Sequence, residues 1–399
     1  MIGKTLKIAV VVAWLAGLGL LAGRYLESSA TEEAAAQSPG AVLSSADAAS
    51  KAARSEEDWH GLYLEGTKVG WSHSLLAPEG EGWHFEDEMV WEMSILGNAR
   101  RLEMKQHGRL DGAYALERVG FLLETEGARL NLEAERKGKD LAVLLRTGGG
   151  EQRLSFPVDG PLYTSRSLTP YLRQVGIKPG AVHRLLVFEP SVQQNTEMEV
   201  RIGNKEEITV GAEKRSLYRV EQKLLGLTVT AWIDDNATAW IERSPEGLTA
   251  VREDAARAKQ GIKGGTLDLA SLFAVRVSRE IPNPARLSSL RLLIEGIPED
   301  FTDLGDYRQH YKARKFSVER EPVPEHGSYS LPYASKEFEE FLKEEPLLPV
   351  RDEKLVTKAR EILSGEKDPV EAARKLSAWV HRALEKTPVA GFPNALEAL

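Results

Sequence analysis

The clearest pattern in the chain is an alternation of apolar and polar residues that runs from about residue 59 to residue 257. In Trp83–Ile95, apolar side chains stand at every second position, and Asp87 is the only break on the apolar side. Gly97-Asn98 then indicates a turn, after which Leu102 and Met104 continue the alternation. Because successive side chains of a strand point to opposite faces, the pattern predicts antiparallel strands with one covered face.

Further strands and one helix are predicted in the same region. The strands are expected at Ala128–Ala134, Leu141–Leu145, Glu197–Ile202, Leu217–Lys223, Thr228–Ile233 and Thr238–Arg243. The helix is expected at Leu168–Val175, where it could plug the concave side of a curved sheet. We therefore predict a β-rich domain over residues 59–258. Such a sheet resembles the lipoprotein-carrier or clam-like barrels of bacterial envelopes, an analogy at the level of fold alone.

The remainder of the chain is expected to contain a second β-rich unit, a connector and helices. The glycine-rich segment Gln260–Thr266 marks a boundary, and residues 259–321 are expected to form the second β-rich unit. Residues 322–350 are a Pro-rich connector. In residues 351–399, one amphipathic helix carries its apolar stripe from Leu355 to Leu363. A second opens at Asp368, followed by a proline at the first helical position. A third helix is expected to begin after Asn394.

The N-terminus has the features of a targeting segment. Lys4 and Lys7 precede an uncharged run, Ile8–Gly23, whose sixteen residues would span about 24 Å as a helix, against roughly 30 Å for a bilayer core. With its flanking residues a span is feasible. We predict a transmembrane anchor over residues 1–26, which places the protein in the inner membrane as a single-pass protein with its bulk in the periplasm. A cleaved signal peptide is the alternative. Residues 27–58, rich in Ala, Ser and Glu, predict a flexible linker.

Composition and motifs exclude several kinds of chemistry. The 52 basic and 60 acidic residues give a net charge of −8, which argues against a nucleic-acid partner. The chain has no cysteine, so it can form neither a disulfide nor a thiolate metal site. Its eight histidines lack metal-ligand spacing, and we expect His84 and His381 to be solvated or packing residues. The S-x-x-K string at Ser364–Lys367 has no accompanying K-T-G and is interpreted as chance. We predict no catalytic, cofactor-binding or metal-binding residue in the chain.

Two pairs of tryptophans leave a further choice open. Trp83 and Trp91 share a strand face, and Trp232 and Trp240 lie on strands that could be neighbours. On the concave side of a curved sheet they could hold a lipid or peptide. Packing of the sheet core requires such residues as well, and we expect the packing role.

The C-terminal run DPVEAARKLSAWVHRALEKTPVAGFPNALEAL resembles the segment that leads into the catalytic part of bacterial transglutaminase-like proteins. The matching positions are Trp379, Val380, Pro393, Ala395, Leu396, Glu397 and Leu399, and the family often has Ser where Asn394 stands here. All of these are framework residues. In the family, a Gly-Asp-Cys motif with the nucleophilic cysteine follows, and then a histidine and an aspartate. Here they would lie beyond Leu399, so the resemblance implies a chain truncated before its catalytic residues.

The resemblance implies a membrane-anchored envelope protein related to cysteine hydrolases or acyl transferases that act on peptide or protein amides. Without the thiol, the chain itself is expected to be inactive. The implied fold class is α+β: the N-terminal anchor, two mostly antiparallel β domains, and the leading helices of a transglutaminase-like domain over residues 351–399. The alternative is a non-catalytic envelope protein whose β clam binds a lipid or peptide. The expected partners are the inner membrane and an envelope peptide, protein or lipid, with no cofactor.

Overall fold

The computed structural model describes four stretches of the chain. These are residues 55–268 apart from 96, 127, 148, 149 and 246; residues 277–296; residues 308–384 apart from 323, 334, 336, 337, 340, 341 and 345–347; and residues 395–399. The chain divides into two compact units. The first comprises residues 1–272, 345–349 and 386–399, and the second comprises residues 273–344 and 350–385.

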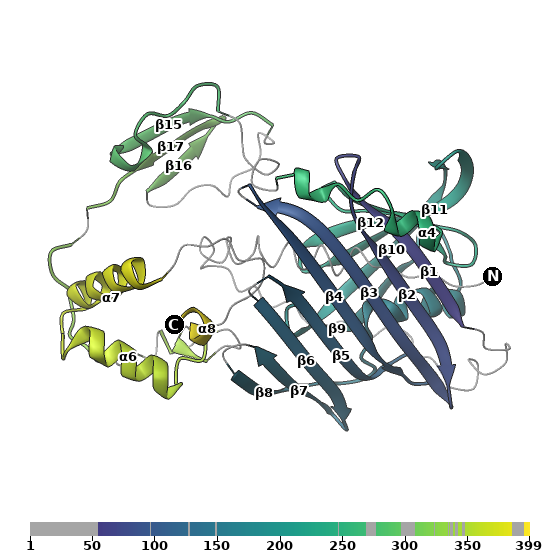
Figure 1. Ribbon diagram of the computed structural model, residues 1–399, viewed down its shortest axis with the longest axis horizontal. Coiled ribbons are helices and arrows are strands. Elements are labelled where there is room, and N and C mark those ends of the chain that lie inside the picture. Colours follow the sequence, from purple (N-terminus) through teal and green to yellow (C-terminus); the bar gives the residue numbers. More distant parts are fainter. Residues whose placement is uncertain are drawn as a thin grey trace. The chain divides into compact units, whose positions relative to one another are not determined.

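The first unit is built on a fourteen-stranded antiparallel sheet (Figure 1). Its strands are β1 (Glu56–Leu64), β2 (Thr67–Glu79), β3 (Gly82–Ile95), β4 (Asn98–Leu110), β5 (Leu116–Thr125), β6 (Ala128–Lys137), β7 (Asp140–Thr147), β8 (Gly150–Pro157), β9 (Val182–Glu189), β10 (Gln194–Val210), β11 (Glu213–Leu224), β12 (Leu227–Ile233), β13 (Ala239–Arg243) and β14 (Leu248–Glu253). The order across the sheet is β8-β7-β6-β5-β4-β3-β2-β1-β14-β13-β12-β11-β10-β9. Chain neighbours therefore pair except for β8 and β9, which are the two edges, and β1 pairs with β14 in the middle of the sheet.

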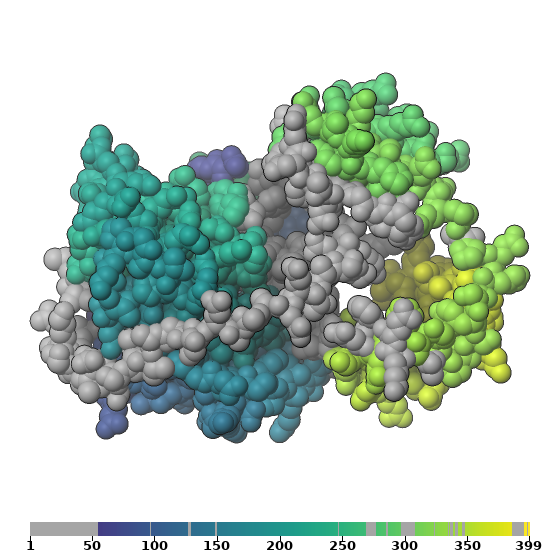
Figure 2. All heavy atoms as spheres, turned by 180° about the vertical axis from the view of Figure 1, so that it is seen from behind, coloured from purple at the N-terminus to yellow at the C-terminus, as the bar shows by residue number. Residues whose placement is uncertain are grey.

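The sheet curls until its two edge strands approach each other. Phe156 on β8 and Phe188 on β9 have ring centroids 6.4 Å apart. The segment between them completes the curl, because the Leu116 N–H on β5 donates to the Leu162 carbonyl and the Tyr163 N–H donates to the Leu186 carbonyl on β9. Strands β2–β7 lie in front in Figure 1, and the teal atoms of β9–β12 lie on the side seen in Figure 2. The curved, mostly antiparallel sheet expected from the alternation is confirmed.

The inner face of this sheet is the hydrophobic core. One cluster covers the inside of β1–β8 and includes Phe85, Trp91 and Phe121. A second cluster forms where the helix α3 (Leu168–Val175) packs on the inner face of β9–β12, as predicted for a helix on the concave side. The short 3₁₀ helix η1 (Ser165–Ser167) leads into α3.

The predicted strands and their inward faces are largely confirmed. The segment predicted as Trp83–Ile95 is β3, and its apolar residues Phe85, Met89, Trp91 and Met93 are buried. Asp87 also faces inward, where Arg166 Nη1 of η1 lies 3.8 Å from its Oδ1. The charged residue that breaks the apolar pattern therefore faces an opposite charge from the helical segment inside the sheet.

The second unit holds a small sheet and two helices. The sheet has the order β15-β17-β16. Its elements are β15 (Ser289–Leu293), β16 (Gln309–Lys312) and β17 (Lys315–Glu319), and the helices are α6 (Glu353–Leu363) and α7 (Pro369–Ala383). The predicted helix ends are confirmed. Ser364 has a φ of 49° after α6, and the Asp368 carboxylate accepts the Val370 N–H at the start of α7. Short helices α4 (Ala255–Lys259), η2 (Gly264–Thr266), η3 (Pro284–Arg286) and α8 (Ala395–Ala398) complete the described elements.

The predicted membrane anchor needs correction. Within the stretches that the structure describes, none of the helices has the length and apolar character to cross a bilayer. The segment 1–26, on which the prediction rested, lies outside the described residues, as do residues 27–54. The transmembrane anchor, the inner membrane as a partner and the inner-membrane location are therefore not supported. An apolar run of sixteen residues is short for a span, and it is also compatible with other roles.

Candidate functional site

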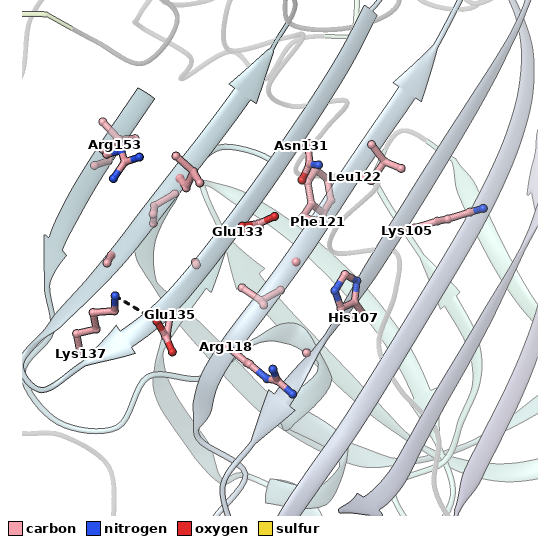
Figure 3. A pocket seen from close by; sticks show the side chains of 18 of the residues that line it. Lys105, His107, Arg118, Phe121, Leu122, Asn131, Glu133, Glu135, Lys137 and Arg153 are labelled. Carbon is pink, nitrogen blue, oxygen red and sulfur yellow. Dashed lines mark ion pairs between the residues drawn. The ribbon is translucent and has the colours of Figure 1, made fainter. Parts of the chain in front are cut away.

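A groove of about 850 Å³ lies on the outer face of β3–β8 (Figure 3). The strand period places alternate residues on this face, so the groove is lined by the outward side chains of several neighbouring strands. The outward lining residues are His84, Lys105, His107, Arg118, Gly120, Leu122, Asn131, Glu133, Glu135, Lys137, Ala142, Leu144 and Arg153. The groove therefore depends on strand pairing, since its residues come from strands that are spread over the segment 82–157.

The strand register explains why the surface is hollow at this place. His107 on β4 is paired with Gly120 on β5, which is paired in turn with Glu133 on β6. A Cβ on Gly120 would lie 2.5 Å from Cε1 of His107, so the imidazole lies directly over the glycine. A larger residue would displace this ring. Ala142 on β7, whose side chain is a single methyl group, is the other small outward residue of the lining.

The floor of the groove carries apolar side chains beside the charged ones. Leu122, Ala142 and Leu144 are half-buried and point outward into the groove. Their exposed hydrocarbon surface gains free energy when a ligand covers it, at about 25 cal/mol per Å². The floor therefore offers binding energy, and the charged side chains around it offer selectivity.

Basic and acidic side chains stand on adjacent strands of the groove. Lys105, His107 and Arg118 extend from β4 and β5, whereas Glu133 and Glu135 extend from β6 (Figure 3). We call these the basic column and the acidic column. All five residues are exposed. Since the columns belong to adjacent strands, a ligand that lies across the strands meets both.

Most of these charges are already paired within the protein. Glu133 accepts from Arg146 Nη1 at 2.9 Å, and Glu135 lies 3.3 Å from Lys137 Nζ. In the basic column, Lys105 Nζ is 3.4 Å from a carboxylate oxygen of Glu88. At the groove margin, Arg153 bonds Glu151 at 3.0 Å, and His84 bonds Glu86 at 3.0 Å.

Arg118 differs from the other charged residues of the groove. Its side chain makes no hydrogen bond or ion pair with any residue that the structure describes. Glu135 is its directly opposite neighbour in the register, but that carboxylate pairs with Lys137 on its own strand. On its other side stands Arg109, a like charge, which is bound by Glu117 and Glu79. Arg118 is therefore available to an external anion.

A second polar cluster lies inside the curled sheet. Arg252 Nη1 on β14 donates to Asp58 Oδ1 on β1 at 2.9 Å, and the Asp58 side chain is fully buried. Burial lowers the pKa of Arg252 to about 10. Glu56 pairs with Arg173 of α3, and burial raises the pKa of Glu56 although Arg173 opposes the shift. These paired charges attach α3 and β14 to β1, and we assign them a structural role.

The histidines and tryptophans singled out in the sequence are mostly packing or surface residues. His84 lies at the groove margin, and His381 lies on α7 in the second unit. Trp91 is a core residue that is 1% exposed, and Trp83 stacks on Tyr114 with centroids 5.2 Å apart. Trp232 and Trp240 do lie on the neighbouring strands β12 and β13. A bulge interrupts the register at this point, and both half-buried tryptophans pack against one small apolar cluster of Val210, Leu217 and Ile241.

Sequence reasoning did not identify the groove. Most of its residues occupy the polar positions of the alternating pattern, such as Lys105 next to Met104. Every strand with one exposed face has such positions, so they do not indicate a binding site. The one available signal was Gly120, an isolated glycine within a strand, which often marks a close approach of other atoms. Among the described residues, no group of His, Cys, Asp or Glu is arranged to hold a metal ion.

Comparisons with known proteins find only distant similarity. No family model matches the chain, and no curated protein matches it. A solved β-barrel-like protein of the domain of unknown function DUF1849 from Brucella abortus is 12% identical. It has a TM-score of 0.38, with 51% of this chain and 98% of that chain covered. A DUF1089 family protein from Pseudomonas aeruginosa is 16% identical, with a TM-score of 0.24 and coverage of 54% and 95%. At such scores neither structure supports an inference about function.

The transglutaminase-like interpretation is corrected, because no family model of that kind matches the chain. The resemblance rested on residues that many helices share. Trp379 and Val380 lie on α7, whose cap and apolar stripe are typical of any amphipathic helix, and Val380 is exposed. Pro393 and Asn394 lie outside the described residues.

Proposed function

We propose that the protein is a non-catalytic binding protein that holds an extended peptide segment in the outer groove of β3–β8. The observation that carries this proposal is a set of outward apolar side chains, Leu122, Ala142 and Leu144, that share the groove with the adjacent basic and acidic columns. A volume of about 850 Å³ falls within the usual range for ligand sites, roughly 300–1,000 Å³.

The groove residues favour binding over catalysis. None of the side chains that line the groove carries a hydroxyl or a thiol, so a covalent intermediate on those usual nucleophiles is not available there. Glu133 and Glu135 are both held in ion pairs with cations of the protein. His107 is exposed, and no described residue orients its ring by a hydrogen bond, as a general base requires.

A peptide suits the groove better than an acyl chain does. The groove is open along one side, and its rim is made of exposed charged residues such as Lys105 and Glu133. An acyl chain lying there would keep much of its surface in water, whereas each buried CH₂ contributes only about 0.8 kcal/mol. A peptide carries polar backbone and charged side chains that can remain at the open side. Five strands, from β4 to β8, span about 19 Å, which accommodates roughly six extended residues.

The test selects binders from a random peptide library displayed on phage. The library is panned against the full chain and, separately, against Ala142→Phe, which fills the floor of the groove from an outward position. We expect peptides to be enriched on the wild-type chain and to bind Ala142→Phe at least about tenfold more weakly, a difference of roughly 1.4 kcal/mol. Thr230→Phe on the outer face of β12 is the matched control and should leave binding unchanged.

Circular dichroism of both variants establishes that they fold. The proposal is overturned if no peptide is enriched, or if the enriched peptides bind wild type and Ala142→Phe equally well. A dansylated long-chain fatty acid serves as the competing probe. Saturable binding of that probe, lost in Ala142→Phe, together with no peptide enrichment, would replace the peptide by a lipid.

A further inference from the structure

We infer that the peptide held in the groove is acidic, and that a carboxylate of the peptide binds the guanidinium of Arg118. This inference rests on the proposed peptide-binding function and adds the chemical class of the ligand. Arg118 projects from β5 into the same part of the groove as His107, on the side opposite Glu133 (Figure 3).

The pairing of charges within the groove leads to this inference. Both carboxylates of the acidic column are neutralised by cations of neighbouring positions, Arg146 and Lys137. Lys105 and Arg153 are likewise paired with carboxylates on the protein. After these pairs are accounted for, the guanidinium of Arg118 remains as the charge without a partner among the described residues that line the groove. A ligand of negative charge is therefore favoured over one of positive charge.

The position of Arg118 in the register strengthens the attraction. Arg109 stands directly opposite on β4, so a second guanidinium adds to the positive potential, although Glu117 and Glu79 bind it. Carboxylates bind guanidinium groups through two parallel hydrogen bonds, and such charge-assisted pairs are stronger than neutral ones. The half-buried Leu122 lies four residues further along the same strand and the same face, so an extended ligand can cover it while a carboxylate pairs with Arg118.

The carboxylate could belong to a side chain or to the C-terminus of the peptide. An enriched peptide is therefore synthesised in four forms: with its Asp and Glu residues intact or replaced by Asn and Gln, and with a free or an amidated C-terminus. Binding of each fluorescein-labelled form to the full chain is measured by fluorescence anisotropy. If replacement of Asp and Glu weakens binding, the carboxylate belongs to a side chain. If amidation weakens binding, it belongs to the C-terminus.

Arg118→Gln removes the charge from an exposed position, so the sheet is expected to fold normally. We expect the acidic peptide to bind this variant about tenfold more weakly, and the neutral peptide to bind it as it binds wild type. Arg118→Lys should retain part of the affinity, since a single ammonium lacks the paired donors of the guanidinium. Lys223→Gln, an exposed lysine on β11 outside the groove, is the control and should have no effect. Raising the salt concentration should weaken only the acidic peptide's binding to wild type.

Two results separate this inference from the proposed function. If acidic and neutral peptides bind wild type equally and Ala142→Phe abolishes both, the peptide groove stands and the role of Arg118 is refuted. If Ala142→Phe has no effect on either peptide, the groove itself is refuted. Equal binding of the acidic peptide to Arg118→Gln and to wild type also overturns the inference.

Discussion

Replacing Trp91 with alanine tests the assignment of the inner face of the large sheet. Trp91 is 1% exposed and lies on β3 between Gly70 on β2 and Leu102 on β4. A tryptophan buries about 150–250 Å² in a core, which at about 25 cal/mol per Å² corresponds to roughly 4–6 kcal/mol. Partial relaxation around the cavity lowers the expected loss to about 3–5 kcal/mol. Such a loss is a large fraction of the stability of an ordinary domain.

The loss is measured by urea unfolding of the full chain, followed by circular dichroism in the β-sheet region. Trp232→Ala is the control, because Trp232 is half-buried on the outer face and bonds Glu206 through Nε1. We expect the control to lose no more than about 1–2 kcal/mol. A loss below about 1 kcal/mol for Trp91→Ala would show that the side chain points outward. Since a one-residue slip in register turns every side chain of a strand over, that result would refute the register of β3.

Two further predictions concern buried charges. Asp58→Ala should cost about 3–5 kcal/mol in urea unfolding, because it leaves the guanidinium of Arg252 buried without its carboxylate; a loss under 1 kcal/mol would contradict the structural role of this pair. Glu189 is fully buried and bonded by Ser191, and burial raises the pKa of this carboxyl to about 7. The folded state therefore holds a proton that the unfolded state releases at lower pH. Stability should be full below pH 4.5 and fall by up to about 3 kcal/mol as the pH rises to 7. Glu189→Gln should flatten this decline in unfolding curves recorded from pH 4.5 to 8, and an unchanged pH profile would refute the assignment.

Local patterns in the sequence were sufficient for several elements. The alternation in Trp83–Ile95 predicted a strand and its buried face, and the structure has β3 with Phe85, Met89 and Trp91 inside. Asp368 predicted the start of α7, and the apolar stripe from Leu355 to Leu363 predicted α6. These features depend on interactions within a few residues, such as a carboxylate that accepts the N–H two positions away, so a single stretch of sequence contains them.

Other features depend on partners far away in the chain. β1 begins at Glu56, in a stretch whose composition predicts a linker, because its first residues pair with Ser74–Leu76 of β2; Arg173 of α3 also binds the Glu56 carboxylate. The resemblance of the C-terminal residues to a catalytic family was misleading for a related reason. The apolar stripe of an amphipathic helix indicates that one face packs, but it does not identify the element that covers this face.

The groove was decided by the tertiary structure alone. Arg118 and Glu135 are seventeen positions apart, and only the register of β5 and β6 places them opposite each other. Glu135 nevertheless forms its ion pair with Lys137 on its own strand, and this pairing leaves Arg118 without that carboxylate. The alternation of apolar and charged residues shows that the charged side chains of a strand lie on its exposed face, and it says no more about their positions than that. The pairing of strands and the resulting choice of ion-pair partners determined which of them line a common site.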